Sequence, residues 1–424
     1  RFNKKPTIYP FTSINYTGRI TGMSVVAGAM EPMLVPASDP ALDDLAFDLV
    51  QSASTLAASL KPEVRTEIGR LVRSMNCYYS NFLEGHQTHP RDIERALASD
   101  YSADPVQRSL QAEARAHIEV QAAIDADIDA PKDWPASEPY VRWIHREFCS
   151  RLPDDMLVTR TVDTKRVVRI VPGEYRTDTV EVGQHTPPRA DLLPEFMARF
   201  TEAYRSDRLS KTQQLLCAAT AHHRLAWIHP FADGNGRVAR LMSHAILLRL
   251  GIGSSLWSVS RGLARQPEQY KTLLAAADQP RRNDLDGRGA LSLEALKDFC
   301  RFFLRVCIDQ VEFMCGLLQP GEILRRIEIY VNEEVAAKRL PKGSFEMLRE
   351  AFYEGSVARG RAPQITGYEE RRARDTLSAL LERGLLIASS PRGPVSLGIP
   401  MDVVERWLPT LYPIDSPIVS TRRT

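Results

Sequence analysis

A short stretch of the chain, His229 to Arg240, brings together residue types that bind phosphate groups and move protons. Its sequence is HPFADGNGRVAR, so two glycines flank an asparagine directly before a segment with helical periodicity. Glycine lets the backbone bend until successive N–H groups converge, and the N-terminal end of the next helix adds positive potential. The stretch therefore predicts a loop that cradles an anion.

The charged side chains of this stretch indicate what the anion is. Arg237 and Arg240 lie in the first turn of the predicted helix, where a cation is unfavourable by about 0.3–1 kcal/mol unless an anion compensates it. A polyphosphate fits, because backbone groups can hold one phosphate and arginine forks the others. Asp233 could bind Mg²⁺ between phosphates, and His229 could take a proton from an incoming hydroxyl group.

The loop needs two helices to hold it, and the sequence supplies them. Apolar residues at helical spacing fill 210–228, a segment that must end at Pro230, and 237–250, which follows the loop. Further helical patterns cover 41–50, 63–84, 91–99, 105–126, 137–152, 192–206, 264–278 and 291–318. The loop is therefore expected within a mainly helical domain.

The segment from 158 to 190 interrupts the helical patterns. β-Branched residues at 167–171 precede Pro172-Gly173, and Val180, Glu181 and Val182 alternate in polarity before Gly183. Such runs, bounded by glycine and proline, predict a β-hairpin with flanking loops inside the helical domain.

A second, smaller unit is predicted after Pro320-Gly321. Helical patterns over 322–338, 344–355 and 367–383 precede two short strands, 385–388 and 395–397, which is the element order of a winged helix-turn-helix. Between 361 and 392 six arginines stand against four acids, a small surplus for a DNA-binding surface. We therefore expect this unit to contact protein, through target docking or dimerisation, with DNA contact as the alternative.

The stretch from His229 to Arg240 meets every specified position of the pattern H-[PF]-F-x-[DE]-G-N-G-R-x-x-R, and so resembles the signature of the Fic family. The resemblance implies transfer of AMP from ATP to a hydroxyl side chain of a target protein, with His229 as the general base and Asp233 as the Mg²⁺ ligand. It also implies that Phe231 anchors the loop. The phosphate-binding residues that it implies are Gly234, Asn235, Gly236, Arg237 and Arg240. The related Doc toxins, which transfer phosphate, carry a lysine near the second glycine, so Gly236 favours nucleotidyl transfer.

Two further segments extend this resemblance. Pro172 to Thr177, together with Val180, Glu181 and Val182, is similar to the family's flap, the hairpin that aligns a target segment by strand addition. Tyr270 stands where family members line the adenine site. The family often has paired tyrosines there, and Gln269 replaces the first, so a core tyrosine is the alternative.

A third segment resembles the family's inhibitory motif, [ST]-x-x-x-E-[GN]. Ser80 and Glu84 are four residues apart, so they share one face of a predicted helix that Gly85 ends. The resemblance implies that Glu84 contacts Arg240 and uses the charge that the γ-phosphate needs. The chain would then be an autoinhibited enzyme of the subclass with an N-terminal inhibitory helix. Glu84 could also position a water for the reverse reaction, removal of AMP.

Composition narrows the class of partners. The 424 residues include 55 Lys and Arg and 53 Asp and Glu, which argues against a protein that works mainly as a polycation on nucleic acid or membrane. No apolar run reaches the length of about 18 residues that a membrane span needs. The six cysteines form no C-x-x-C pair, which favours buried thiols in the cytoplasm. His222, His223 and His229 lack a cysteine or fourth ligand at zinc spacing.

These patterns predict a mainly α protein: a Fic-fold helical bundle with a β-hairpin flap and a C-terminal winged-helix domain. The expected parts are an N-terminal segment with the inhibitory helix (1–100), the catalytic core (101–318) and the winged helix (322–424). The expected function is transfer of AMP from ATP, with Mg²⁺, to a Ser, Thr or Tyr of a target protein, and self-modification and a homodimer are considered. The alternatives are a nucleotide-sensing transcription regulator and a Fic enzyme that removes AMP or transfers another nucleotide.

Overall fold

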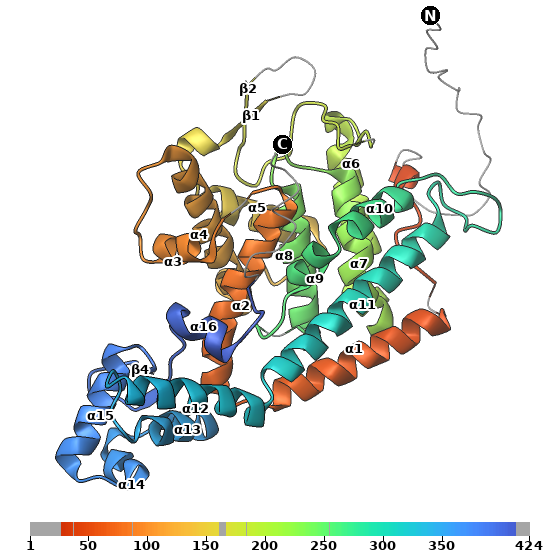
Figure 1. Ribbon diagram of the computed structural model, residues 1–424. Helices are drawn as coiled ribbons and strands as arrows, with labels where there is room; N and C mark the ends of the chain where they lie inside the picture. Colours follow the sequence, from red (N-terminus) through yellow and green to blue (C-terminus); the bar gives the residue numbers. More distant parts are fainter. Residues whose placement is uncertain are drawn as a thin grey trace, which may run out of the picture.

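The computed structural model describes residues 27–36, 38–86, 88–160, 167–183, 185–253 and 255–412. Within these ranges the chain is mainly helical, with two small antiparallel sheets, which confirms the predicted fold class (Figure 1). Residues 1–26 and 413–424, which belong to the first and third predicted segments, lie outside the described ranges. No helix within the described ranges is long and apolar enough to cross a membrane.

Eleven helices make up the larger part of the described chain, and they pack around a large hydrophobic core and a smaller cluster among α2, α3 and α4. They are α1 (Pro40–Ala58), α2 (Pro62–Leu83), α3 (Pro90–Leu97), α4 (Pro105–Asp125), α5 (Glu138–Cys149), α6 (Leu193–Ala203), α7 (Lys211–Ile228), α8 (Asn235–Arg249), α9 (Val259–Arg265), α10 (Pro267–Ala277) and α11 (Leu293–Leu317). Many begin with proline in the first turn, where the missing N–H costs no hydrogen bond.

Helices α7 and α8 form the centre of this bundle. Both carry buried residues around most of their circumference, as expected for helices that are covered on all sides. A capping box fixes the start of α7: the Ser210 hydroxyl accepts from the Gln213 N–H, and the Gln213 side chain accepts from the Ser210 N–H. The loop that joins α7 to α8 carries the predicted phosphate-binding stretch, so two buried helices hold it from both ends.

The β-hairpin lies earlier in the chain than the sequence predicts. Strand β1 (Val158–Arg160) pairs with β2 (Val167–Arg169), and Val158 lies opposite Arg169. The predicted second strand at 180–182 is wrong, because only Val182 pairs there, in a single bridge to His185 across a tight turn. The reason is that a three-residue alternation is too short to distinguish a strand from an extended loop.

Within residues 320–412 the C-terminal unit contains five α-helices and a three-stranded sheet of order β3-β5-β4. Its elements are α12 (Pro320–Ala336), α13 (Ser344–Glu354), β3 (Ser356–Val357), α14 (Ala362–Thr366), α15 (Glu370–Glu382), β4 (Leu386–Ala388), β5 (Val395–Leu397) and α16 (Met401–Trp407). The three longer helices and strands β4 and β5 lie where the sequence predicts them, whereas β3, α14 and α16 were not predicted. The identification as a winged helix stays a prediction.

The C-terminal unit rests on helix α2. The Arg70 guanidinium donates to the Ile399 carbonyl at 3.0 Å, and the Tyr412 hydroxyl donates to the Leu71 carbonyl at 3.2 Å. Helix α2 also packs against α4 and α9 of the bundle, and Figure 1 shows α16 beside α2. The helix that carries Ser80 and precedes Glu84 is therefore held between the bundle and the C-terminal unit.

Candidate active site

The loop between α7 and α8 turns sharply because two residues adopt left-handed backbone conformations. His229 ends α7 with φ of 49°, and Gly234 precedes α8 with φ of 80°. Glycine adopts this conformation at no steric cost, whereas histidine does so only when its surroundings hold it. Arg176 provides that support, since its guanidinium donates to the His229 carbonyl at 2.8 Å and its N–H to the Pro230 carbonyl at 2.9 Å.

Asn235 closes the loop. Its side-chain oxygen accepts from the Phe231 N–H at 2.9 Å, and its side-chain nitrogen donates to the Phe231 carbonyl at 2.8 Å. The Phe231 ring is fully buried and stacks on His145 at 3.9 Å between ring centroids. The amide of Asn235 is therefore used to shape the loop, and the part of the predicted cradle that can face an anion is the backbone at the start of α8.

His229 has the protonation state and tautomer of a general base. Its Nδ1 lies 3.3 Å from the Ala226 carbonyl oxygen, which can only accept, so Nδ1 carries the hydrogen and Nε2 keeps its lone pair. Burial lowers the pKa of His229 to about 4, and the nearby charge of Arg176 acts in the same direction. The imidazole is therefore neutral at pH 7 and able to accept a proton.

Arg240 is bound to the segment that the sequence predicts to be inhibitory. Its guanidinium donates to the Ser80 hydroxyl at 2.9 Å, to the Ser80 carbonyl at 3.2 Å and to the Glu84 carboxylate at 2.5 Å. The Arg240 side chain is 4% exposed and that of Glu84 is 32% exposed. Burial opposes the charge on Glu84, but Arg240 and then Arg237 outweigh it and lower the pKa of this carboxyl group.

Glu84 lies directly over the start of α8. A Cβ atom added to Gly236 would stand 2.4 Å from a carboxylate oxygen of Glu84 and 3.1 Å from the Arg240 guanidinium. No other residue than glycine fits at 236 while Glu84 holds this place. The carboxylate thus occupies the position at the helix N-terminus where an anion would bind.

Arg237 contacts a different set of residues from Arg240. Its guanidinium donates to Glu113 at 3.0 Å, lies 3.2 Å from Nδ1 of His86, and stands over the Phe148 ring at 5.1 Å from the ring centroid. Burial disfavours its charge, but Glu113, Glu84 and Asp233 outweigh burial and raise the pKa of Arg237. Glu113 was not predicted from the sequence, because nothing in its helical pattern distinguishes it from other glutamates.

Asp233 is the exposed carboxylate of the loop. Mg²⁺ is usually held by one or two carboxylates, several waters and the phosphates of a substrate. A solvent-facing carboxylate one residue before the predicted cradle fits that donor set, so Asp233 is suited to the Mg²⁺ that the resemblance implies.

The segment predicted to be the flap is fixed at its base and exposed at its tip. Besides its bonds to the loop, Arg176 donates to the Asp178 carbonyl at 2.8 Å and to the Pro188 carbonyl at 2.5 Å. Glu181 and Val182 are exposed and Val180 is half-buried. Arg176, which lies within the range Pro172 to Thr177, thus ties both ends of this segment to the loop, a role that was not predicted from the sequence.

Tyr270 lies in the hydrophobic core. The ring is 7% exposed, and the hydroxyl lies 2.7 Å from Nε2 of His222, whose Nδ1 lies 3.0 Å from the Ser243 hydroxyl. Burial raises the pKa of Tyr270 to about 12. The tyrosine is buried and also lies near Arg240, and its role in adenine binding stays a prediction.

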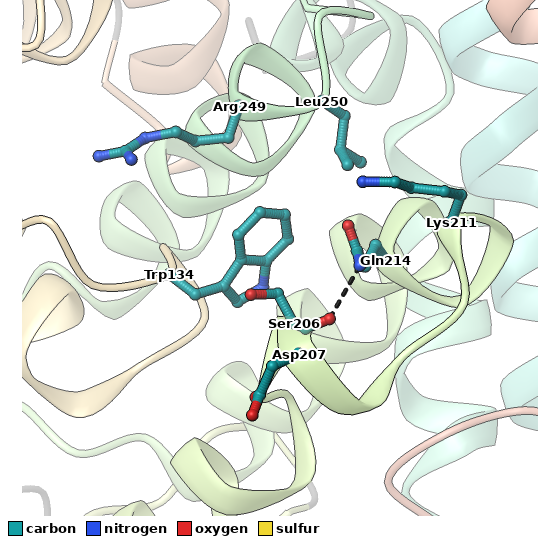
Figure 2. Close-up of a pocket in the computed structure, with 7 residues that line it drawn as sticks. All are labelled: Trp134, Ser206, Asp207, Lys211, Gln214, Arg249 and Leu250. Carbon is teal, nitrogen blue, oxygen red and sulfur yellow. Dashed lines mark hydrogen bonds between the residues drawn. The ribbon is translucent and has the colours of Figure 1, made fainter.

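A hollow at the opposite end of α8 is separate from this site. Figure 2 shows its lining, in which Gln214 donates to the Ser206 carbonyl at 2.8 Å. The lining residues are Trp134, Ser206, Asp207, Lys211, Gln214, Arg249 and Leu250. Because Arg249 ends α8 and Asn235 begins it, the full length of the helix separates this hollow from the loop.

The loop and its two helices fall in a segment with known relatives. Residues 135–247 match the Fic/DOC family profile. The chain is 33% identical over 144 residues to the protein adenylyltransferase Fic of Drosophila virilis, a match that covers 33% of this chain and 30% of that protein. The same protein of Drosophila willistoni is 33% identical over 144 residues, covering 33% of this chain and 29% of that protein.

One solved structure is similar over most of the described fold. It is the crystal structure of a Fic family protein from Desulfovibrio desulfuricans G20, with a TM-score of 0.51 and 19% identity, covering 85% of this chain and 97% of that one. At this identity the similarity concerns the fold. Together the comparisons support a Fic-family domain in this chain. Ser80, Glu84, Glu113 and Tyr270 lie outside the segment that matches the family profile.

Proposed function

We propose that the chain transfers AMP from ATP to a hydroxyl side chain of a target protein. The observation that carries the proposal is the joint placement of a neutral His229, with a free lone pair on Nε2, and two buried arginines at the N-terminus of α8. A Ser, Thr or Tyr oxygen attacks the α-phosphorus of ATP and gives its proton to His229 Nε2, and the bond to the pyrophosphate leaving group breaks. Self-modification uses the same step on a hydroxyl of this chain.

Other residues around His229 would bind the phosphates, the metal ion and the target segment. Backbone N–H groups of Gly234, Asn235 and Gly236 face the phosphates, while Arg237 and Arg240 bind the β- and γ-phosphates. Asp233 would hold Mg²⁺, which neutralises phosphate charge when it is bound. Val180, Glu181 and Val182 would receive an extended target segment by strand addition, which the exposure of Glu181 and Val182 permits.

We infer that the described conformation is the inhibited one. Glu84 is bound to Arg240 and fills the position at the start of α8, so ATP could bind only after this carboxylate moves or in a pose with a displaced γ-phosphate. Ser80 holds Arg240 in the same orientation through two further bonds. Movement of Glu84 alone would therefore leave Arg240 in place for a phosphate.

The small surplus of arginine over acid between 361 and 392 favours protein contact over DNA contact. Two of the six arginines also form ion pairs, Arg361 with Glu350 at 2.6 Å and Arg383 with Glu334 at 3.2 Å. A transcription regulator that only senses nucleotide is therefore the less favoured function.

The test is intact mass spectrometry of the Glu84→Gly variant incubated with ATP and Mg²⁺. We expect a mass increase of one or more AMP groups, no increase when His229→Ala is added, and little labelling of the unaltered chain. The matched control is Glu354→Gly, because Glu354 likewise stands at the C-terminal end of a helix directly before a glycine, Gly355. A Glu84→Gly protein that binds ATP by calorimetry but gains no AMP would contradict the proposal, and parallel incubations with UTP, GTP and CTP would reveal another nucleotide as donor.

A further inference from the structure

A second carboxylate, from a different helix, lies at the pair of arginines Arg237 and Arg240. Glu113 projects from α4, which packs against both α2 and α8. One carboxylate oxygen of Glu113 accepts from the Arg237 guanidinium at 3.0 Å and from Nδ1–H of His86 at 2.8 Å. The side chains of Arg237 and Glu113 are 5% and 13% exposed, so this contact is largely removed from water.

Glu113 and Glu84 approach the start of α8 differently. The three atoms nearest to a Cβ placed on Gly236 belong to Glu84 and Arg240, and the one atom within 4 Å of a Cβ placed on Gly234 belongs to His145. Glu84 therefore lies over Gly236, whereas Glu113 bonds to the side chains of Arg237 and His86. An anion that binds over Gly236 must displace Glu84.

The contacts of Arg237 fix its guanidinium group from several directions. Glu113 holds Nη2 from α4, and the Phe148 ring of α5 lies against the guanidinium plane. Arginine loses much rotamer freedom when it binds phosphate, so a guanidinium that is already ordered binds with a smaller entropic cost. A carboxylate partner also keeps the buried cation charged and hydrogen-bonded before the phosphate arrives.

We propose that Glu113 is a positioning residue, which orients Arg237 for the phosphates of the nucleotide and keeps this role after Glu84 has left the site. The proposal rests on the proposed function, because that function assigns Arg237 to phosphate binding. The opposite role would be that of a second inhibitor, in which Glu113 competes with phosphate for Arg237. The two roles predict changes of opposite sign.

The experiment measures ATP·Mg²⁺ binding by calorimetry, and AMP transfer as initial rate against ATP concentration, in the Glu84→Gly protein with and without Glu113→Gln. The glutamine keeps the size of the side chain and removes its charge. We expect the Kd and the KM for ATP to rise about tenfold, with a smaller change in maximal rate, and Glu113→Asp to recover part of the loss. The control is Glu119→Gln on the same helix, whose side chain is 39% exposed and pairs with Arg115 and Arg151.

A double-mutant cycle separates positioning from a merely structural role. In a protein that already carries Arg237→Ala, we expect Glu113→Gln to change the Kd for ATP by less than about twofold, because its effect acts through Arg237. An unchanged or lower Kd for Glu113→Gln alone, or an equal loss with and without Arg237, overturns the proposal.

The same data separate this proposal from the proposed function. If Glu84→Gly binds ATP but transfers no AMP, the proposed function fails, and the calorimetric cycle still decides the role of Glu113. If Glu84→Gly binds no ATP at all, both proposals are overturned.

Discussion

His117 offers a direct test of how the polar interior beside the arginine pair affects stability. It lies on α4 one turn after Glu113 and is fully buried, and among the described residues neither of its ring nitrogens has a hydrogen-bond partner. Burial, reinforced by the positive charges of Arg240 and Arg237, lowers its pKa from 6.5 to about 3. Replacement by leucine keeps an apolar volume at this position and removes the titrating group.

The expected effect follows from proton linkage. The pKa of His117 is lower in the folded chain, so the unfolded chain takes up the proton first as the pH falls below 6.5. Stability is therefore intact above pH 6.5 and is lost progressively until the pH reaches about 3. At pH 5 the loss from this one group is about 2 kcal/mol, since each pH unit below 6.5 costs about 1.4 kcal/mol. His117→Leu removes that loss, and at pH 7.5 it leaves stability equal or raises it by about 1 kcal/mol.

Urea unfolding of the unaltered chain and of His117→Leu, followed by tryptophan fluorescence at pH 7.5, 6.0 and 5.0, measures this difference. Other buried histidines titrate in both proteins, so their contributions cancel in the comparison. The matched substitution is His89→Leu, at an exposed histidine before α3, and it is measured at the same three pH values. If the advantage of His117→Leu does not grow as the pH falls, then His117 is not held neutral in the folded chain and the reasoning is refuted.

Two further predictions concern the residues that shape the loop. Asn235→Ala should lower the free energy of unfolding by about 2 kcal/mol, because two buried backbone groups lose their hydrogen-bond partner. It should also abolish AMP transfer in the Glu84→Gly protein. Unchanged transfer would show that the loop keeps its shape without the asparagine. Arg176→Met should speed hydrogen exchange over 177–183 and slow transfer to a target while the Kd for ATP stays constant. The control is Arg189→Met, an exposed arginine of the same segment, and equal exchange in both variants would remove Arg176 from its role as the anchor of the flap.

The sequence could predict the loop between α7 and α8 because its geometry is local. Helical periodicity ends at Pro230, the glycines permit the turn, and the arginines fall in the first turn of the next helix, so every feature lies within a dozen residues. The contact between Glu84 and Arg240 spans 156 positions. This contact was expected only through the resemblance to a family motif. Helical periodicity alone predicts that a helix ends near Glu84 but does not predict which residue Glu84 contacts.

The residues that the sequence analysis missed act through distant partners. Glu113 is one of many glutamates on helical patterns, and only the packing of α4 against α8 places it on Arg237. Arg176 forms its bonds with backbone carbonyls, which carry no signal of side-chain type. The hairpin prediction failed for a related reason, because short β-branched runs do not specify which segment pairs with β2.

The placement of α2 indicates how the proposed inhibition by Glu84 would be relieved. Asn76 and Arg73 of α2 bind Gln121 and Asp125 of α4 at 2.7 and 3.1 Å, and the C-terminal unit adds its contacts on another side. Withdrawal of the helix would break all of these bonds, at about 1 kcal/mol for each neutral one and 1.5–3 kcal/mol for each charged one. Rotation of the Glu84 side chain breaks one bond, and Glu84 lies just beyond the last residue of the helix. We therefore expect Arg240 to be released by movement of the Glu84 carboxylate alone. Helix α2 would stay in place, and Ser80 would still hold Arg240 toward the start of α8.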